Sequence, residues 1–163
     1  MRFFKRAVIL SDLAATEWLG GELARALPED VAGWIMLLQG ELGSGKSTLA
    51  RAMLRELGAK GAVPSPTYTL VEPYKLSSSS IYHIDLYRIS DPEELDFLGW
   101  SDLEDGLRII EWPEQIPGLT AKADVLVGLR YEGSGRVAQL TAMSDRGDEY
   151  LTRLALPEVS VSP

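Results

Sequence analysis

Apolar and polar positions along the chain follow two spacings, one typical of strands and the other typical of helices. Short, nearly continuous apolar runs are typical of buried strands, and alternating runs of half-buried ones. Strands are predicted at Phe3–Leu10, Trp34–Leu38, Ile81–Leu86 and Leu107–Ile110. Near the end of the chain, Val125–Tyr131 and Arg136–Met143 flank a glycine-containing turn sequence at 132–135, which predicts a hairpin.

Two helices are predicted from apolar residues that recur three or four positions apart. The first can be capped by Ser11 or by Asp12 and continues to about Leu27. The second covers Lys46–Leu57 and is ended by Gly58, a residue that readily adopts the backbone conformation at a helix end.

Between the second helix and the next strand, Val63–Tyr74 is predicted to be extended, because its three prolines exclude a helix. Asp91-Pro92-Glu93-Glu94 has the cap, proline and acid of a helix start, and a short helix is expected near Tyr150–Leu154. The pattern predicts an α/β fold with a mostly parallel sheet flanked by helices and with antiparallel additions, including the C-terminal hairpin. We expect a single domain over residues 1–157 and a tail at 158–163.

Composition narrows the classes of protein that this pattern can represent. The 163 residues fit one domain, and the lack of cysteine excludes disulfides, thiolate metal sites and thiol nucleophiles. No stretch approaches the roughly 20 apolar residues of a membrane span, and the N-terminal apolar run is too short for a signal peptide, so a cytoplasmic protein is expected. The net charge of −8 disfavours independent binding to DNA or RNA, because lysine and arginine supply most of that affinity. Any work on RNA would need a basic partner.

The candidate chemistry begins where the second predicted strand ends. Gly40–Ser47 reads G-E-L-G-S-G-K-S and matches G-x-x-x-x-G-K-[ST], the phosphate-binding P-loop. Glycines let consecutive backbone N–H groups turn toward a phosphate, and the start of the following helix adds unpaired N–H groups. Lys46 would reach the β- and γ-phosphates, and the Ser47 hydroxyl would ligate Mg²⁺. The segment therefore predicts a site for ATP or ADP with magnesium.

Two carboxylates at the ends of predicted strands are candidates for holding the metal's coordination shell or for orienting the attacking water. Asp85 ends the strand that begins at Ile81, and Glu111 ends the strand that begins at Leu107. The pattern does not assign the roles between them. His83, the only histidine, lies opposite in phase to its neighbours on the strand, which predicts a packed or surface side chain rather than a catalytic one.

Ser65-Pro66-Thr67-Tyr68-Thr69 is a hydroxyl-rich segment after the P-loop helix. In nucleotide switches the loop at this place often senses the γ-phosphate. Prolines would equally protect an exposed edge strand from pairing with another chain. Both interpretations are open at this point.

Four segments taken together resemble the TsaE (YjeE) family of bacterial ATPases for threonylcarbamoyladenosine modification of tRNA. They are GELGSGKSTLARAML, SPTYTLVEPY, YHIDLYRISDPEELDFLG and IIEWPE, within a resemblance over about Leu10–Arg136. The resemblance implies a P-loop NTPase fold and slow intrinsic ATP hydrolysis. It further implies that the protein works with the TsaB–TsaD pair, which modifies the adenosine beside the anticodon of tRNAs reading ANN codons. The ATPase would be needed for turnover and would meet tRNA through these partners.

The resemblance also assigns roles around the phosphates. The phosphate-loop positions are Gly43, Ser44, Gly45, Lys46, Ser47 and Thr48. Ser47 and Glu111 correspond to the magnesium positions, and Asp85 to the acid implicated in hydrolysis, so that Asp85, Lys46 and Glu111 form the predicted catalytic group. Thr67 and Thr69 fall on the switch-like loop.

Four further residues correspond to nucleotide contacts. Trp112 matches an aromatic residue near the nucleotide, and Arg136 matches a basic residue at its edge. Ser11 and Thr16 match an N-terminal segment that approaches the base.

Three other functions fit parts of the sequence. A small-molecule kinase on the same fold is the first alternative, but it usually needs an arginine-rich lid that the chain does not contain. A guanine-specific GTPase generally needs an N-K-x-D segment, and the chain has no asparagine. A nucleotide-gated assembly factor without turnover is the third. Arg88 and Arg136 are the candidates for an arginine finger, and the lack of an obvious one predicts slow turnover, because such a group contributes ~10³–10⁵ in rate.

Overall fold

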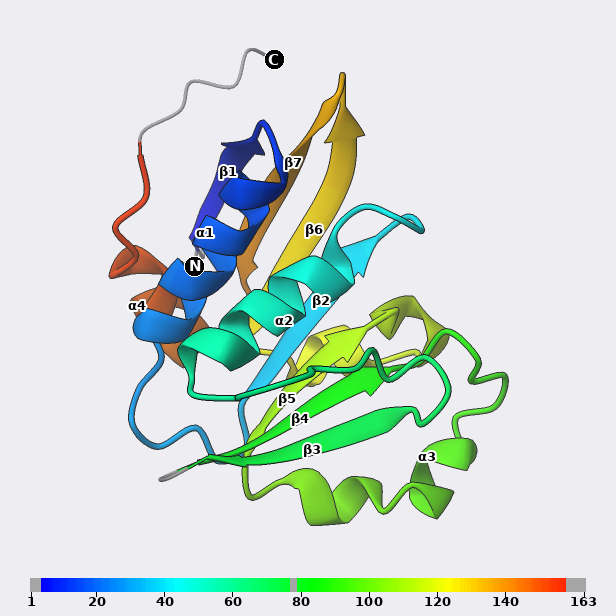
Figure 1. The fold of residues 1–163 in the computed structure, drawn as a ribbon. Helices are drawn as coiled ribbons and strands as arrows, with labels where there is room; N and C mark the ends of the chain where they lie inside the picture. Colours follow the sequence, from blue (N-terminus) through cyan, green and yellow to red (C-terminus); the bar gives the residue numbers. More distant parts are fainter. Residues whose placement is uncertain (1–3, 77–78, 158–163) are drawn as a thin grey trace.

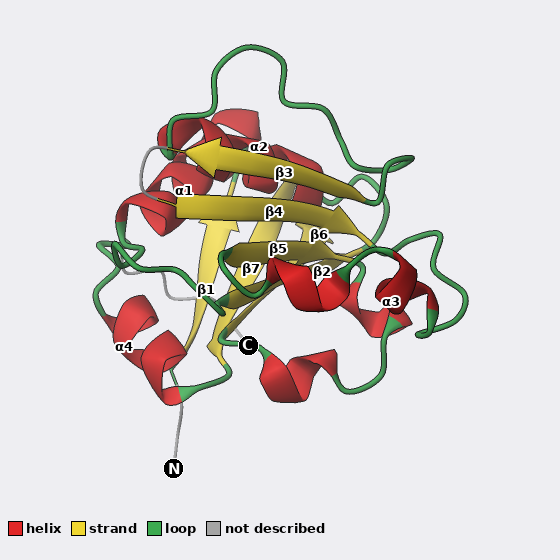
Figure 2. Cartoon of the chain, turned by 90° about the horizontal axis from the view of Figure 1, so that it is seen from below, coloured by secondary structure: helices red, strands yellow, loops and turns green. Residues whose placement is uncertain are grey.

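The computed structural model describes residues 4–76 and 79–157, in which one sheet separates two layers of helices (Figures 1 and 2). The strands are β1 (Lys5–Leu10), β2 (Ile35–Gly40), β3 (Val71–Leu76), β4 (Ser79–Asp85), β5 (Leu107–Glu111), β6 (Val125–Glu132) and β7 (Gly135–Ala142). The α-helices are α1 (Leu13–Arg25), α2 (Lys46–Glu56), α3 (Glu94–Phe97) and α4 (Asp145–Thr152). Short 3₁₀ helices are η1 (Trp100–Leu103), η2 (Pro113–Gln115) and η3 (Leu119–Lys122).

The seven strands form a single sheet in the order β1-β7-β6-β2-β5-β4-β3. The central strands β6, β2, β5 and β4 are parallel to one another. The outer strands β1, β7 and β3 pair antiparallel, and β6 and β7 form the predicted hairpin. The α/β class and its antiparallel additions are confirmed, with the parallel part confined to the middle of the sheet.

Strand β2 shows why its sequence is apolar at consecutive positions. Met36 and Leu38 pack into the core beneath α1 and α2, whereas Ile35 and Leu37 pack into a second core on the opposite face. Side chains of a strand alternate between faces, so a strand covered on both faces needs apolar residues throughout. Figure 2 shows α1 and α2 over one face of the sheet and α3 toward the other.

The topology collects the carboxyl ends of three parallel strands at one edge of the sheet. Leu38 of β2 and Asp85 of β4 both pair with Glu111 of β5. The P-loop follows β2 directly and leads into α2. The candidate acids and the loop are therefore brought together by strand order, as is usual for ligand sites in open α/β sheets.

Three predicted elements differ from the structure. Val63–Tyr74 is not extended throughout: residues 66–70 form a turn closed by a 2.8 Å hydrogen bond from the Leu70 N–H to the Pro66 carbonyl, and β3 begins only at Val71. Proline excludes a helix interior but is favoured in turns, which the prediction overlooked.

The other two differences concern helices. The start at Asp91–Glu94 produces only the four-residue α3, which ends before Gly99 at φ +69°. The last helix begins earlier than predicted, because the Ser144 side chain caps it by accepting a hydrogen bond from the Gly147 N–H.

At the N-terminus, Asp12 rather than Ser11 caps α1, with its carboxylate 2.8 Å from the Ala15 nitrogen. Phe3 and the predicted tail at 158–163 lie outside the described residues. Within the part of the chain that the structure describes, no helix is both long and apolar enough to cross a membrane.

Candidate functional site

The P-loop adopts a backbone that its glycines make possible. Gly43 has φ +78° and Gly45 has φ +111°, both in the left-handed region that other residues rarely adopt. A Cβ atom at Gly43 would also lie 2.8 Å from the Tyr131 hydroxyl oxygen. The loop can therefore turn its backbone toward α2 only with glycine at these positions.

Lys46 lies against this loop as the first residue of α2. Its Nζ donates to the carbonyls of Gly40 (2.6 Å) and Glu41 (2.9 Å) and lies 4.2 Å from the centre of the Trp112 ring. The side chain is buried, and burial lowers the pKa of the Lys46 ammonium, an effect opposed mainly by the charge of Glu111. Trp112 reaches this position with φ +58°, one of two non-glycine residues with positive φ among those described.

Ser47 and Glu111 meet at the C-terminal edge of the sheet. The Ser47 Oγ lies 3.0 and 3.1 Å from the two carboxylate oxygens of Glu111, which is only 2% exposed. Asp85 lies across from Glu111 in the parallel register and is 5% exposed. The two predicted acids and the predicted metal-binding hydroxyl are thus neighbours.

The two acids have different hydrogen-bond partners. An Asp85 oxygen accepts from the Tyr87 N–H at 2.9 Å, whereas Glu111 is engaged by side chains. Burial raises the pKa of the Asp85 carboxyl, the Tyr87 N–H opposes this, and the charge of Glu111 adds to it. The Asp85 carboxyl therefore has a higher pKa than an ordinary aspartate and binds a proton more readily.

His83 is a residue of this site that the sequence pattern did not assign to it. It is packed, as predicted, with no exposed surface, and its Nε2 lies 2.6 Å from the Glu111 Oε2. The available signal was its spacing from Asp85, because residues two apart on a strand share a face. That spacing alone does not identify which neighbouring strand supplies the partner.

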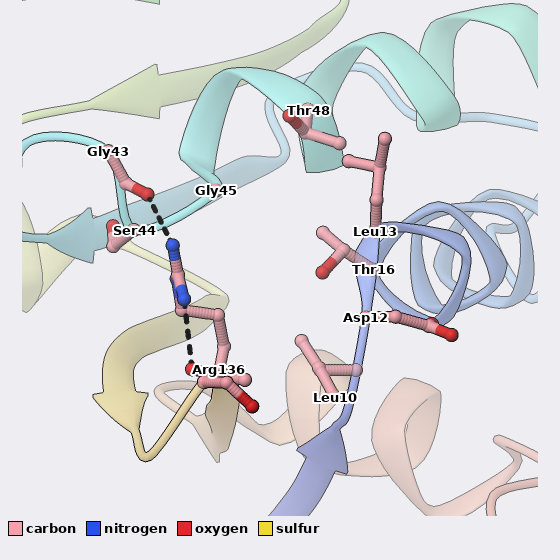
Figure 3. A pocket seen from close by; sticks show the side chains of 11 residues that line it. Leu10, Asp12, Leu13, Thr16, Gly43, Ser44, Gly45, Thr48 and Arg136 are labelled. Atoms are coloured by element: carbon pink, nitrogen blue, oxygen red, sulfur yellow. Dashed lines mark hydrogen bonds between the residues drawn. The ribbon is translucent and has the colours of Figure 1, made fainter.

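Two cavities meet at the P-loop. One, of about 260 Å³, lies on the side of the acids and is lined by Leu42, Gly43, Gly45, Lys46, Ser47, Thr48, Thr67, Asp85, Tyr87, Glu111 and Trp112. The other, of about 200 Å³, is lined by Leu10, Asp12, Leu13, Thr16, Gly43, Ser44, Gly45, Thr48, Ser134, Gly135 and Arg136 (Figure 3). We call them the metal-side and the base-side cavity. Gly43, Gly45 and Thr48 line both, so the loop joins them.

The base-side cavity lies between the start of α1, the P-loop and the β6–β7 hairpin. Figure 3 shows the Arg136 guanidinium beside the Gly43 carbonyl, facing Thr16 and Leu13 across the cavity. Its Nη2 donates to that carbonyl at 3.2 Å. Of the two predicted base-side residues of the N-terminal segment, Thr16 lines the cavity, whereas Ser11 is not among the lining residues and Asp12 takes its place.

Side chains of the β6–β7 hairpin donate hydrogen bonds to carbonyls of the P-loop. Besides Arg136, the Tyr131 hydroxyl donates to the Leu42 carbonyl at 2.8 Å, and the Arg136 guanidinium lies 4.0 Å from the centre of the Tyr131 ring. Two carbonyls of the loop are thus fixed by side chains 89 and 93 residues away in the sequence. The sequence pattern did not identify Tyr131.

The segment Ser65–Thr69 is a turn beside the site rather than an edge strand. Thr67 lines the metal-side cavity and shares a 2.8 Å hydrogen bond with Ser65, whereas Thr69 donates to Glu72. The Asp85 N–H donates to the carbonyl of Leu70, just after the turn, at 2.9 Å. The edge strand β3 begins only after this segment, so the edge-strand interpretation is wrong.

Comparisons with known proteins identify the family of this chain. Residues 10–138 match the family model described as "Threonylcarbamoyl adenosine biosynthesis protein TsaE". Relatives named "tRNA threonylcarbamoyladenosine biosynthesis protein TsaE" include one from Haemophilus influenzae, 44% identical over 120 residues, which are 72% of this chain and 76% of the relative. Another, from Synechocystis, is 40% identical over 128 residues, 75% of this chain and 76% of the relative.

Among solved structures, the crystal structure of Bacillus subtilis YdiB shares this fold. It superimposes with a TM-score of 0.72 over 95% of this chain and 97% of that one, at 19% sequence identity. The matched region includes the P-loop, both acids, Trp112 and Arg136. The chain therefore belongs to the TsaE family of threonylcarbamoyl adenosine biosynthesis proteins.

Proposed function

We propose that this protein is the ATP-binding and ATP-hydrolysing subunit of the machinery that forms threonylcarbamoyladenosine in tRNA. The proposal rests chiefly on one observation: the Ser47 hydroxyl, Glu111 and Asp85 converge at the end of a P-loop. Family membership supplies the pathway, and this group supplies the chemistry. The hydrolysis is magnesium-dependent. It is also intrinsically slow, because no arginine is placed among the residues that line the metal-side cavity.

The two cavities suggest the orientation in which the nucleotide binds. We assign the triphosphate to the P-loop with its γ-phosphate toward the metal-side cavity, where Lys46 and Thr67 lie. The base then occupies the base-side cavity between Thr16 and Arg136. Gly43, Ser44, Gly45, Lys46, Ser47 and Thr48 bind the phosphates, with the N–H groups at the start of α2 directed at them. Trp112 contacts Lys46 and covers the phosphate side.

The donors at Ser47 and Glu111 fit magnesium. Mg²⁺ prefers hard oxygen ligands and usually takes one or two from the protein, the rest coming from phosphate and water. A hydroxyl and a carboxylate, 3.0 Å apart at the end of the loop, are donors of this kind. When bound, the ion neutralises charge on the phosphates.

Asp85 is the better placed of the two acids to orient the attacking water. Both acids line the cavity, but the oxygens of Glu111 are already engaged by Ser47 and His83, whereas Asp85 has only one oxygen held, by a backbone N–H. Its raised pKa also makes the Asp85 carboxylate a better proton acceptor than an ordinary aspartate.

The partners are the TsaB–TsaD pair, and tRNA is reached through them in the cytoplasm. The net charge of −8 supports this, because an acidic chain repels the phosphates of tRNA. The protein would drive turnover of the assembly without itself transferring the threonylcarbamoyl group.

The test is the release of phosphate from ATP, measured for the protein alone, with TsaB–TsaD, and with TsaB–TsaD and tRNA. We expect a low rate alone, stimulation by the complex, and ADP and phosphate as the only products. Lys46→Ala should remove the activity in every mixture. Absence of both stimulation and co-purification would contradict the proposed partnership, and a phosphorylated metabolite would indicate the small-molecule kinase instead.

A further inference from the structure

We propose that His83 is a positioning residue, which holds the Glu111 carboxylate in the orientation that Ser47 and Mg²⁺ require. The inference builds on the proposed function, because it concerns the same metal position. It assigns a purpose to the chain's only histidine, a buried side chain that has no contact with the cavities themselves.

The contact is direct and fully enclosed. His83 lies on β4 and Glu111 on β5, and the strands pair with His83 opposite Ile109, so the imidazole reaches diagonally along the neighbouring strand. Nε2 lies 2.6 Å from Oε2, with His83 0% and Glu111 2% exposed. A carboxylate can only accept, so the histidine donates from Nε2, and hydrogen bonds to a charged acceptor are among the stronger ones.

Glu111 needs such a partner because its last torsion is otherwise poorly determined. Rotation about a bond to a planar carboxylate has broad minima, so the plane of the two oxygens can turn. Ser47 alone does not fix this plane: its Oγ lies at nearly equal distances from both oxygens, 3.0 and 3.1 Å, and its single hydroxyl proton can be donated to only one of them at a time. His83 contacts only Oε2 and thereby leaves Oε1 for Ser47 and the metal's surroundings.

Because the Glu111 carboxylate is buried, His83 cannot be explained as a side chain that only fills space. A buried carboxylate is costly unless its oxygens are hydrogen-bonded, and an apolar side chain of the same size would leave Oε2 with the shared Ser47 proton alone. The imidazole Nδ1, by contrast, has no partner among the described residues. The ring is therefore fixed to the site through Nε2 only.

Two variants separate hydrogen bonding from packing. His83→Gln places an amide N–H near the position of the imidazole Nε2, whereas His83→Leu keeps the apolar bulk without a donor. Metal affinity is measured without turnover, from electron paramagnetic resonance of Mn²⁺ titrated into the protein with saturating ADP. The Mg²⁺ dependence of ATP hydrolysis is then separated into the apparent metal constant and kcat.

We expect His83→Leu to weaken Mn²⁺ binding about 10- to 100-fold, as is typical when the partner of a metal-binding group is lost. His83→Gln should recover most of the affinity. Metal-free thermal unfolding shows whether each variant is folded, and His83→Met, with a flexible apolar side chain, replaces His83→Leu if that variant does not fold.

Wild-type Mn²⁺ affinity in both variants would overturn the proposal, as would an equal loss in both folded variants, because the donor would then be irrelevant. Wild-type protein that binds no metal with ADP would instead contradict the proposed function. The two failures are therefore distinguishable.

Discussion

Lys46 shows at the scale of a residue how the fold prepares a phosphate site. Its ammonium is buried against two loop carbonyls and the Trp112 ring, and burial lowers its pKa. A phosphate beside it would supply the negative charge that favours the protonated form. The residue is thus arranged to gain more from an anion than an exposed lysine would.

Replacement of this lysine should affect binding more than folding. We expect Lys46→Ala to weaken ADP binding about 10- to 150-fold, because hydrogen bonds to charged groups contribute about 1.5–3 kcal/mol. Isothermal titration calorimetry with ADP measures the effect, and Lys60→Ala, at an exposed position beyond α2, is the control. Full affinity in Lys46→Ala would contradict the phosphate role.

Asp85 should show a conflict between stability and activity. Burial raises the pKa of the Asp85 carboxyl in the folded protein above the ordinary 3.8. The protonated carboxyl therefore contributes free energy of folding that is fully present below that value and is lost as the pH rises through the folded-state pKa. Asp85→Asn keeps an oxygen for the Tyr87 N–H and carries no charge. We expect it to be more stable than wild type near neutral pH, with the difference shrinking toward about pH 4, and to lose ATP hydrolysis while keeping nucleotide binding.

Thermal unfolding from about pH 4 to about pH 8, without metal or nucleotide, measures this difference. Glu17→Gln, on the exposed side of α1, is the control for removing one negative charge. A stability difference that does not grow with pH would exclude the buried-charge explanation, and unchanged hydrolysis would exclude Asp85 from the reaction.

At the scale of elements, α1 and α2 pack unusually closely at one glycine. A Cβ atom at Gly20 would lie 2.6 Å from the Ala52 Cβ and 2.8 Å from the Leu49 carbonyl oxygen, so no side chain fits between the helices. The neighbouring Gly21 would meet only the end of the flexible Arg25 side chain at 3.3 Å. Close packing of α1 against α2 fixes the helix that starts at the P-loop.

The two adjacent glycines should therefore respond in opposite directions. Gly20→Ala should destabilise the protein by about 1–3 kcal/mol through overpacking. Gly21→Ala should stabilise it by about 0.5–1 kcal/mol, because alanine is favoured over glycine inside helices. Urea unfolding measures both free energies, and equal effects would mean that the two helices do not approach closely at Gly20.

The β6–β7 hairpin is the second element that shapes the loop. Arg136 donates to the Gly43 carbonyl and lines the base-side cavity, whereas Arg130 of the same hairpin is half-exposed and lies near Glu132. We expect Arg136→Ala to weaken ADP binding about tenfold, a loss typical of one charged hydrogen bond. Arg130→Ala is the matched control, and equal affinities for both variants would contradict support of the loop by the hairpin.

At the scale of the whole molecule, a bound nucleotide would connect elements that are distant in the chain. It would contact α1, the P-loop, β4, β5 and the hairpin at once, through residues that line the two cavities. A ligand that binds only the folded chain raises stability according to its concentration relative to Kd. Nucleotide binding should therefore stabilise the whole sheet rather than one loop.

With Mg²⁺ and ADP at about 100 times Kd, the expected gain is about 2.7 kcal/mol. For a domain of this size this corresponds to a Tm increase of about 5–10 °C. Differential scanning calorimetry should detect the increase in the wild type and a clearly smaller one, from about 0.3–1.4 kcal/mol, in Lys46→Ala at the same nucleotide concentration. No shift in the wild type at saturating nucleotide would contradict binding to the folded state.

Features that depend only on nearby residues could be predicted from the sequence. Local spacing and glycine geometry account for the P-loop, for the strand before it, for the strand that ends at Glu111, and for α2 with Gly58 just beyond its end. Local signals also misled: three prolines suggested an extended Val63–Tyr74, and the start at Asp91 suggested a longer helix than α3. A turn satisfies the same local preferences as an extended segment, and a short helix the same as a longer one. The packing of the whole chain decides between these alternatives.

Contacts between side chains that are distant in the chain depend on the tertiary fold. Asp85 and Glu111 could be identified as strand ends, but their adjacency depends on β4 and β5 being neighbours, which the alternation of side chains does not specify. The same is true of His83 with Glu111 and of Tyr131 with Leu42. Strand order and register are set by the summed packing of two cores, so a contact across strands becomes visible only once the whole sheet is formed.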